Sequence, residues 1–208
     1  TVGDGALYLA GLFGDHVERA QGDVSFYVHA GSFAYKHAAA ILEEEVGSSP
    51  VALVELGENF PKFVDVLAEV ADHGWHVVRP VRDAQPVLAH TVGLFRNQDH
   101  PELCVLGQPP GGAVALLDRL AGDVFGGVRF EPGDVHEDPV IGRRLALVAV
   151  SPRLHGDLVP LAVWYHGGAR FPLLQAVWPD PEGRYPWERW SEPGLKGDQP
   201  VLLDRDPA

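Results

Sequence analysis

The sequence lacks methionine altogether and has one cysteine, Cys104, among its 208 residues. A single cysteine excludes an internal disulfide framework and a cysteine-rich zinc site, and it is typical of proteins from a reducing compartment. No stretch approaches the roughly 20 apolar residues of a membrane helix. The first residues also lack the basic flank and apolar core of a signal peptide. We therefore expect a soluble, cytoplasmic protein that does not bind a membrane.

Basic residues are scarce as well, because 16 Lys and Arg stand against 29 Asp and Glu, giving a formal net charge of −13. Contacts to phosphates need clustered positive charge, so we expect no nucleic acid partner. The imbalance is greatest in residues 1–73, which hold 12 acidic and 3 basic side chains. We expect this segment to bind a basic protein partner, with the consecutive Glu43, Glu44 and Glu45 as contact residues.

Several catalytic motifs are absent. The sequence has no Walker loop, no Gly-x-Gly-x-x-Gly turn after a strand, no Gly-x-Ser-x-Gly elbow and no His-Glu-x-x-His pair. These motifs mark nucleotide-dependent enzymes, dinucleotide-binding domains, serine hydrolases and zinc proteases, respectively. None of these classes is favoured, and we assign no cofactor.

Residues 1–73 show the apolar period of helices. The spacing predicts one helix over Ala6–Ala20, a second over Gly31–Val46 and a third that starts at Ser49-Pro50 and runs to Asp72. Pro61 lies inside the third run and disrupts a helix interior, so we expect two short helices to meet there. One face of the second helix carries Phe33, Ala34, His37, Ala38 and Ile41.

The period changes from 3.6 to 2 after Gly74, which predicts a change from helices to a sheet. A helix that opens at Pro109-Pro110 and ends near Val124 interrupts the strands. The expected strands are Trp75–Val81, Val87–Phe95, Glu102–Leu106, Leu145–Val150, Leu161–Tyr165 and Leu173–Trp178. The fold class is therefore α+β, with a helical segment over 1–73, a mixed sheet of about six strands and one main helix over 74–190, and a C-terminal tail over 191–208.

Five phrases follow one another in the second part of the chain. They are GWHVV from Gly74, HTVGL from His90, HPELCVLG from His100, RFEPGD from Arg129 and LLQAVWPDPEGRYPW from Leu173. Over about residues 72–190, the chain resembles the bacterial family called domain of unknown function 4262. Relatives usually have an aromatic residue ahead of the TVGL phrase, so a site around His90 would differ here. The resemblance implies no established activity, cofactor or catalytic residue.

His100 and Glu102 are the candidate catalytic pair. Residues two apart in a strand point the same way, so an imidazole and a carboxylate would lie side by side. A carboxylate orients an imidazole and raises its pKa, which is the basis of acid–base catalysis. The structural alternative is a strand entry, in which Pro101 donates nothing to the ladder and the two polar side chains bind turn backbone.

A pocket walled by aromatic residues would accompany such a pair. We place His90, Gln175, Trp178 and Tyr165 in it as ligand-binding candidates, although aromatic clusters are more often packing. Gln175 is a lone amide in an apolar strand, so it either braces a loop or faces the pocket. Cys104 lies in an apolar run, where a buried, inert thiol is the usual case.

Metal binding is not favoured, because His73, His76, His90 and His100 form no strict ligand motif, and we assign no metal site. Two classes of function remain. The first is a non-catalytic protein-binding or regulatory module, similar to an immunity protein or antitoxin, since acidity suits inhibition of a basic toxin. The second is a small-molecule enzyme of unrecognised type that uses His100 and Glu102. The first class is preferred because no group of residues contains all the parts of a catalytic site. A homo-oligomer is compatible with either class.

Overall fold

The computed structural model describes residues 3, 4, 6, 24–46, 51–79, 87–138 and 142–202. The chain divides into two compact units, Thr1–His73 and Gly74–Ala208. The helix expected over Ala6–Ala20 lies, apart from Ala6, outside the described residues, as does the turn expected at Ser49-Pro50. Among the described residues, no helix has the length and apolar character needed to cross a membrane.

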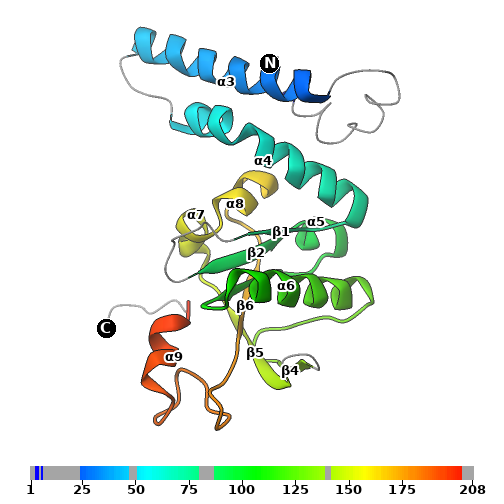
Figure 1. The fold of residues 1–208 in the computed structure, drawn as a ribbon, viewed down its shortest axis with the longest axis vertical. Coiled ribbons are helices and arrows are strands. Elements are labelled where there is room, and N and C mark those ends of the chain that lie inside the picture. The colour runs from blue at the N-terminus through cyan, green and yellow to red at the C-terminus, as the bar shows by residue number, and fades with distance from the viewer. Residues whose placement is uncertain are drawn as a thin grey trace. The chain divides into compact units, whose positions relative to one another are not determined.

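The first unit is helical, as predicted. Its helices α3 (Val24–Val46) and α4 (Val51–His73) lie side by side (Figure 1). Phe60 of α4 packs directly on Gly31 of α3, because a Cβ atom on this glycine would lie 2.1 Å from the phenylalanine ring. Tyr35 packs on the same ring with the centroids 6.0 Å apart. The face of α3 that contains Gly31, Tyr35 and Ala39 is therefore the buried one.

Pro61 does not divide α4, so the prediction of two short helices was wrong. A proline has no N–H, which deprives the carbonyl four residues earlier of its helical partner. That carbonyl belongs to Gly57, and the hydroxyl of Ser32 in α3 donates to it at 2.5 Å. Phe60 and Phe63, on either side of the proline, are buried. One side-chain hydrogen bond and the packing together keep the helix continuous.

The second unit is built on a six-stranded sheet with the order β1-β2-β3-β6-β5-β4. β3 and β6 pair in parallel and the other neighbours pair antiparallel, so the sheet is mixed, as expected. The strands are β1 (His76–Val78), β2 (Leu88–Val92), β3 (Glu102–Leu106), β4 (Val135–Asp138), β5 (Arg143–Ala149) and β6 (Leu173–Val177).

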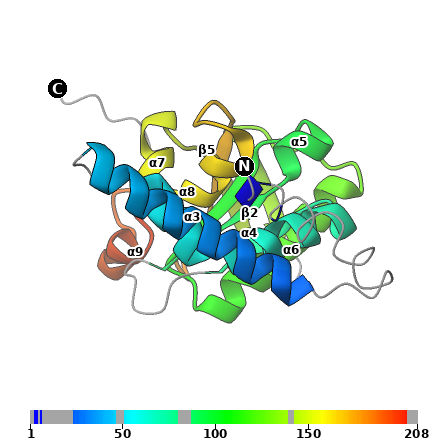
Figure 2. The ribbon, with the colours of Figure 1, turned by 90° about the horizontal axis from the view of Figure 1, so that it is seen from above.

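Helices surround this sheet. They are α5 (Leu94–Gln98), α6 (Pro110–Phe125), the 3-10 turn η1 (Pro152–Leu154), α7 (His155–Leu158), α8 (Pro160–His166) and α9 (Pro193–Asp198). The main helix α6 follows the predicted bounds closely. Its residues Leu116, Leu117 and Leu120 pack into the central core with side chains of one face of the sheet. The α7–α8 segment lies on the opposite side (Figure 2).

The expected strand over Leu161–Tyr165 is helix α8, so that prediction was wrong. Its residues are largely β-branched or aromatic, which suits a strand, but its ends favour a helix. Pro160 occupies the first turn, and Gly167 ends the helix in the left-handed conformation with its N–H bonded to the last carbonyls. The sixth strand is instead β4, an edge strand in which only Asp138 is buried and Val135 is exposed, so it shows no apolar alternation toward the core.

Candidate functional site

A buried carboxylate lies where β2, α5, β3 and α8 meet. Glu102 is fully buried at the start of β3. Its Oε1 accepts hydrogen bonds from the backbone N–H groups of Gly93 at 2.8 Å and Phe95 at 3.2 Å. Gly93 has a φ of 116°, a conformation that favours glycine, and this turn leads from β2 into α5. The TVGL phrase therefore forms a strand, a turn and a short helix around one carboxylate.

Thr91 also forms a hydrogen bond with this carboxylate. Its hydroxyl accepts from the backbone N–H of Leu103 at 2.8 Å. The hydroxyl proton is then free to be donated to Oε2 of Glu102, 2.7 Å away. Thr91 and the two backbone N–H groups thus all donate to the carboxylate oxygens of Glu102, which accept.

His166 supplies the fourth donor. Its Nε2 lies 2.9 Å from Oε1 of Glu102. The carboxylate oxygen accepts in this bond, so Nε2 is the donor, and the bond fixes the orientation of the ring. Three aromatic rings surround the imidazole: Phe171 at 4.6 Å, Tyr165 at 5.1 Å and Phe95 at 5.6 Å between centroids. A carboxylate–imidazole pair of this kind can orient Nδ1 as a general base for a group that reaches it.

His100 takes part in a different set of hydrogen bonds. Its Nε2 accepts from the backbone N–H of Phe130 at 2.9 Å, so the proton is on Nδ1, which donates to the carbonyl of Pro101 at 2.7 Å. Burial lowers the pKa of His100. No hydrogen bond joins it to Glu102 among the described residues. The two members of the predicted pair therefore lie in separate hydrogen-bond networks, and both ring nitrogens of His100 bond to backbone groups.

His90, Cys104 and Gln175 form a row across the sheet face opposite α6, because they are register partners on β2, β3 and β6. His90 is buried, and its Nδ1 lies 3.1 Å from the carbonyl of Thr91. Burial lowers the pKa of His90 to about 4. Cys104 is fully buried, as predicted, and its desolvation raises the pKa of the thiol. Neither group has the character of a reactive nucleophile or base.

Gln175 braces a loop, which is one of the two roles expected for it. Its Nε2 donates to the carbonyl of Pro200 and its Oε1 accepts from the N–H of Leu202, both at 2.9 Å. Gln199 bonds in the same way to the backbone N–H and carbonyl of Trp178. Trp178 belongs to the central core. Two glutamines thus fasten residues 199–202 to the sheet.

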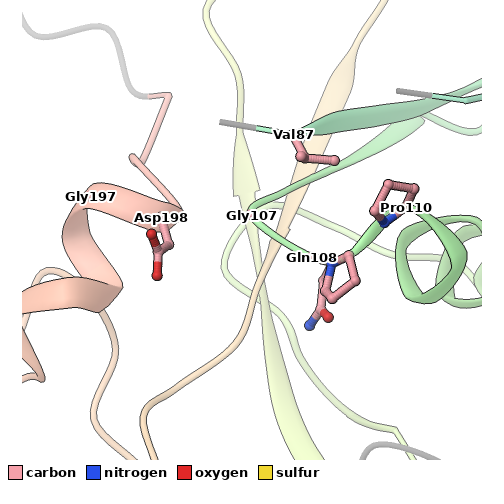
Figure 3. Close-up of a pocket in the computed structure, with 7 residues that line it drawn as sticks. Val87, Gly107, Gln108, Pro110, Gly197 and Asp198 are labelled. Carbon is pink, nitrogen blue, oxygen red and sulfur yellow. The ribbon is translucent and has the colours of Figure 1, made fainter. Parts of the chain in front are cut away.

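Tyr165 alone among the expected pocket residues lies beside the Glu102–His166 pair. The guanidinium of Arg96 stacks over its ring at 4.9 Å. A cavity of about 480 Å³ lies elsewhere, at the opposite end of β3 and the start of α6 (Figure 3). It is lined by Val87, Gly107, Gln108, Pro109, Pro110, Gly197 and Asp198. No predicted site residue and no aromatic side chain is among them.

The predicted partner-binding residues belong to the first unit. Glu43 and Glu44 are exposed near the end of α3, and the side chain of Glu45 lies outside the described residues. Within the described ranges, no three His, Cys, Asp or Glu side chains gather closely enough to hold a metal ion.

Sequence reasoning missed His166 and Thr91. The expected strand over Leu161–Tyr165 ended just before His166, which hid the helix that brings this imidazole to Glu102. Pro160 and the pair Gly167-Gly168 were the signals that could have revealed that helix.

Comparison with known proteins agrees with the motifs. Residues 69–192 match the family described as "Domain of unknown function (DUF4262)". This match spans more than half of the chain, and the chain belongs to this family, which confirms the resemblance over about residues 72–190. No curated protein and no solved structure matches the chain.

Proposed function

We propose that this protein is a protein-binding module of regulatory type, similar in role to an immunity protein or antitoxin, and that its partner is a basic protein. The observation that carries the proposal is the acidic helical unit. Residues 1–73 contain 12 acidic and 3 basic side chains. Glu43 and Glu44 project into solvent at the end of α3. Exposed charge of one sign accelerates the encounter with a partner of the opposite sign.

The hydrogen bonds of the second unit support this proposal. Both ring nitrogens of His100 are occupied by backbone groups. The Cys104 thiol is buried, and Gln175 is bound at both ends of its amide. These side chains act within the fold, and a general base or a ligand-binding amide would need a free face toward a substrate.

The test uses the full chain as bait in a lysate of its source organism, followed by purification of the captured protein and measurement of association rates. Raising salt from 50 to 500 mM should slow association by about tenfold or more. Glu43→Lys with Glu44→Lys should slow it at low salt and leave dissociation nearly unchanged. The matched control is Glu131→Lys with Glu137→Lys, which makes the same charge change at exposed sites of the second unit. An association rate that changes neither with salt nor in the Glu43→Lys, Glu44→Lys variant contradicts the proposal.

A second candidate is a small-molecule enzyme, and the Glu102–His166 pair favours it. In this version His166 replaces His100 as the partner of the carboxylate. Turnover of a small molecule that disappears in His166→Gln and persists in His100→Gln, with both variants folded, would support it. The same result together with no captured partner would defeat the binding proposal.

A further inference from the structure

α3 has a second apolar face, on the side away from α4. Phe26, Phe33 and Ile41 are 64%, 69% and 43% exposed. They are spaced by seven and eight residues, about two helical turns each, and so lie along one side. His37 lies between the last two and stacks on Phe33 with the ring centroids 5.6 Å apart. We call these four residues the outer stripe.

The outer stripe has the dimensions of a helix-binding surface. From Phe26 to Ile41 it extends over about 22 Å at a rise of 1.5 Å per residue. Single exposed apolar side chains are common on protein surfaces, but several on one side of a helix, two of them phenylalanines, are typical of an interaction site. A row with this spacing matches the apolar side of another helix, whose anchor residues recur at i, i+3, i+4 and i+7.

Charge decides which occupant suits the stripe. Glu44 lies eighteen residues, five full turns, after Phe26 and so continues the line of the stripe, with Glu43 beside it. A second copy of the chain would bring another strongly acidic unit against the first, and like charges oppose such an approach. A basic helix would bury the apolar row and place its own charges beside these glutamates.

We propose that the outer stripe of α3 docks an amphipathic helix of the partner, with apolar residues at helical spacing on one side and Lys or Arg along its flanks. This inference rests on the proposed function and adds the surface and the chemistry of the ligand. Phe33, the most exposed apolar residue of the outer stripe, is the central anchor, and Glu43 and Glu44 pair with the basic end of the bound helix.

The test uses a labelled 18-residue peptide of Leu and Lys whose leucines fall on one side of a helix. Its control is a scrambled peptide of the same composition. By fluorescence anisotropy at 150 mM salt, the full chain should bind the amphipathic peptide at least about tenfold tighter than the scrambled one. Phe33→Ser should remove most of this difference, because the loss of one buried aromatic side chain is worth about tenfold or more in affinity. Trp190→Ser, which changes a residue 71% exposed on the other unit, should not.

Four results would overturn the inference. Equal binding of both peptides would show that charge alone attracts them, and the proposed function would stand without the docking surface. A fall of several degrees in the Tm of the free Phe33→Ser chain would show that the chain itself covers the stripe. A dimer that becomes a monomer in Phe33→Ser by sedimentation would make a second copy the occupant. Binding of neither peptide, at low salt as well, would count against the stripe and the basic partner together.

Discussion

Nε2 of His166 lies 2.9 Å from Oε1 of Glu102, although 64 positions separate the two residues in the sequence. The bond connects the end of α8 to a carboxylate that already binds backbone N–H groups at the β2–α5 turn. Glu102 and His166 are both almost fully buried, so leaving either one without its hydrogen-bond partner is costly. This bond therefore helps to hold the end of α8 against β3 and the β2–α5 turn.

Glu102→Gln should destabilise the protein strongly. The neutral amide turns an NH2 group toward donors that need an acceptor, and the hydrogen bond to Nε2 of His166 is weakened. We expect the free energy of unfolding to fall by about 3 kcal/mol or more, as for other broken buried pairs. Urea denaturation followed by tryptophan fluorescence measures it. The exposed Glu131→Gln should change it by less than about 0.5 kcal/mol. A loss below about 1 kcal/mol in Glu102→Gln would show that this network contributes little.

Acid should weaken the fold through His90. The pKa of His90 is about 4 in the folded protein, because burial opposes the charged form, against 6.5 for a free histidine. The unfolded chain therefore binds this proton first as the pH falls. The contribution of neutral His90 to the free energy of unfolding is complete above pH 6.5. It is lost as the pH falls toward 4, which lowers the free energy of unfolding by about 3 kcal/mol.

His90→Phe should remove this part of the pH dependence. Unfolding free energies at pH 7, 5.5 and 4.5 would then fall less steeply than in the parent chain, while the exposed His29→Phe should keep the parent slope. Identical slopes in the parent and His90→Phe would place the acid sensitivity elsewhere.

Substitutions of Ser32 and Pro61 should have coupled effects on stability, because both residues determine which donor the Gly57 carbonyl has. Ser32→Ala leaves the Gly57 carbonyl without a donor and should cost about 1–2 kcal/mol. Pro61→Ala restores a backbone N–H that can bond to the same carbonyl. In that background, Ser32→Ala should cost little. Helical circular dichroism during urea denaturation of the four chains gives the coupling energy, and additive effects would refute the compensation.

Cys104 should react slowly in the native protein. Its thiol is fully buried and its pKa is raised, so the reactive thiolate is scarce at neutral pH. A thiol reagent such as dithionitrobenzoate should label it only as fast as the fold opens, and quickly in denaturant. Rapid native labelling would indicate an accessible, reactive thiol.

The sequence predicts the helical first unit, α6 and five of the six strands, because each of these has an apolar pattern of its own. The prediction fails where the residues inside a segment favour one secondary structure and the residues at its ends favour another. The run before His166 has strand-forming residues, but its proline and glycine ends determine a helix. It fails again at Pro61, whose compensating Ser32 comes from another helix. The Glu102–His166 pair is a contact of the same long-range kind, which no spacing rule along the chain reveals.

The hydrogen bonds made by the side chains of Gln175 and Gln199 have a practical consequence for truncated forms of this protein. The family match ends at residue 192, and a chain cut there would appear to retain every motif. It would also lose Pro200 and Leu202, which would leave the amide of Gln175 without hydrogen-bond partners in the middle of β6. The loss of Gln199 would likewise remove the two hydrogen bonds that its side chain forms with the backbone of Trp178. We therefore expect a chain that ends at residue 192 to be less stable than one that extends to residue 202, ten residues beyond the end of the family match.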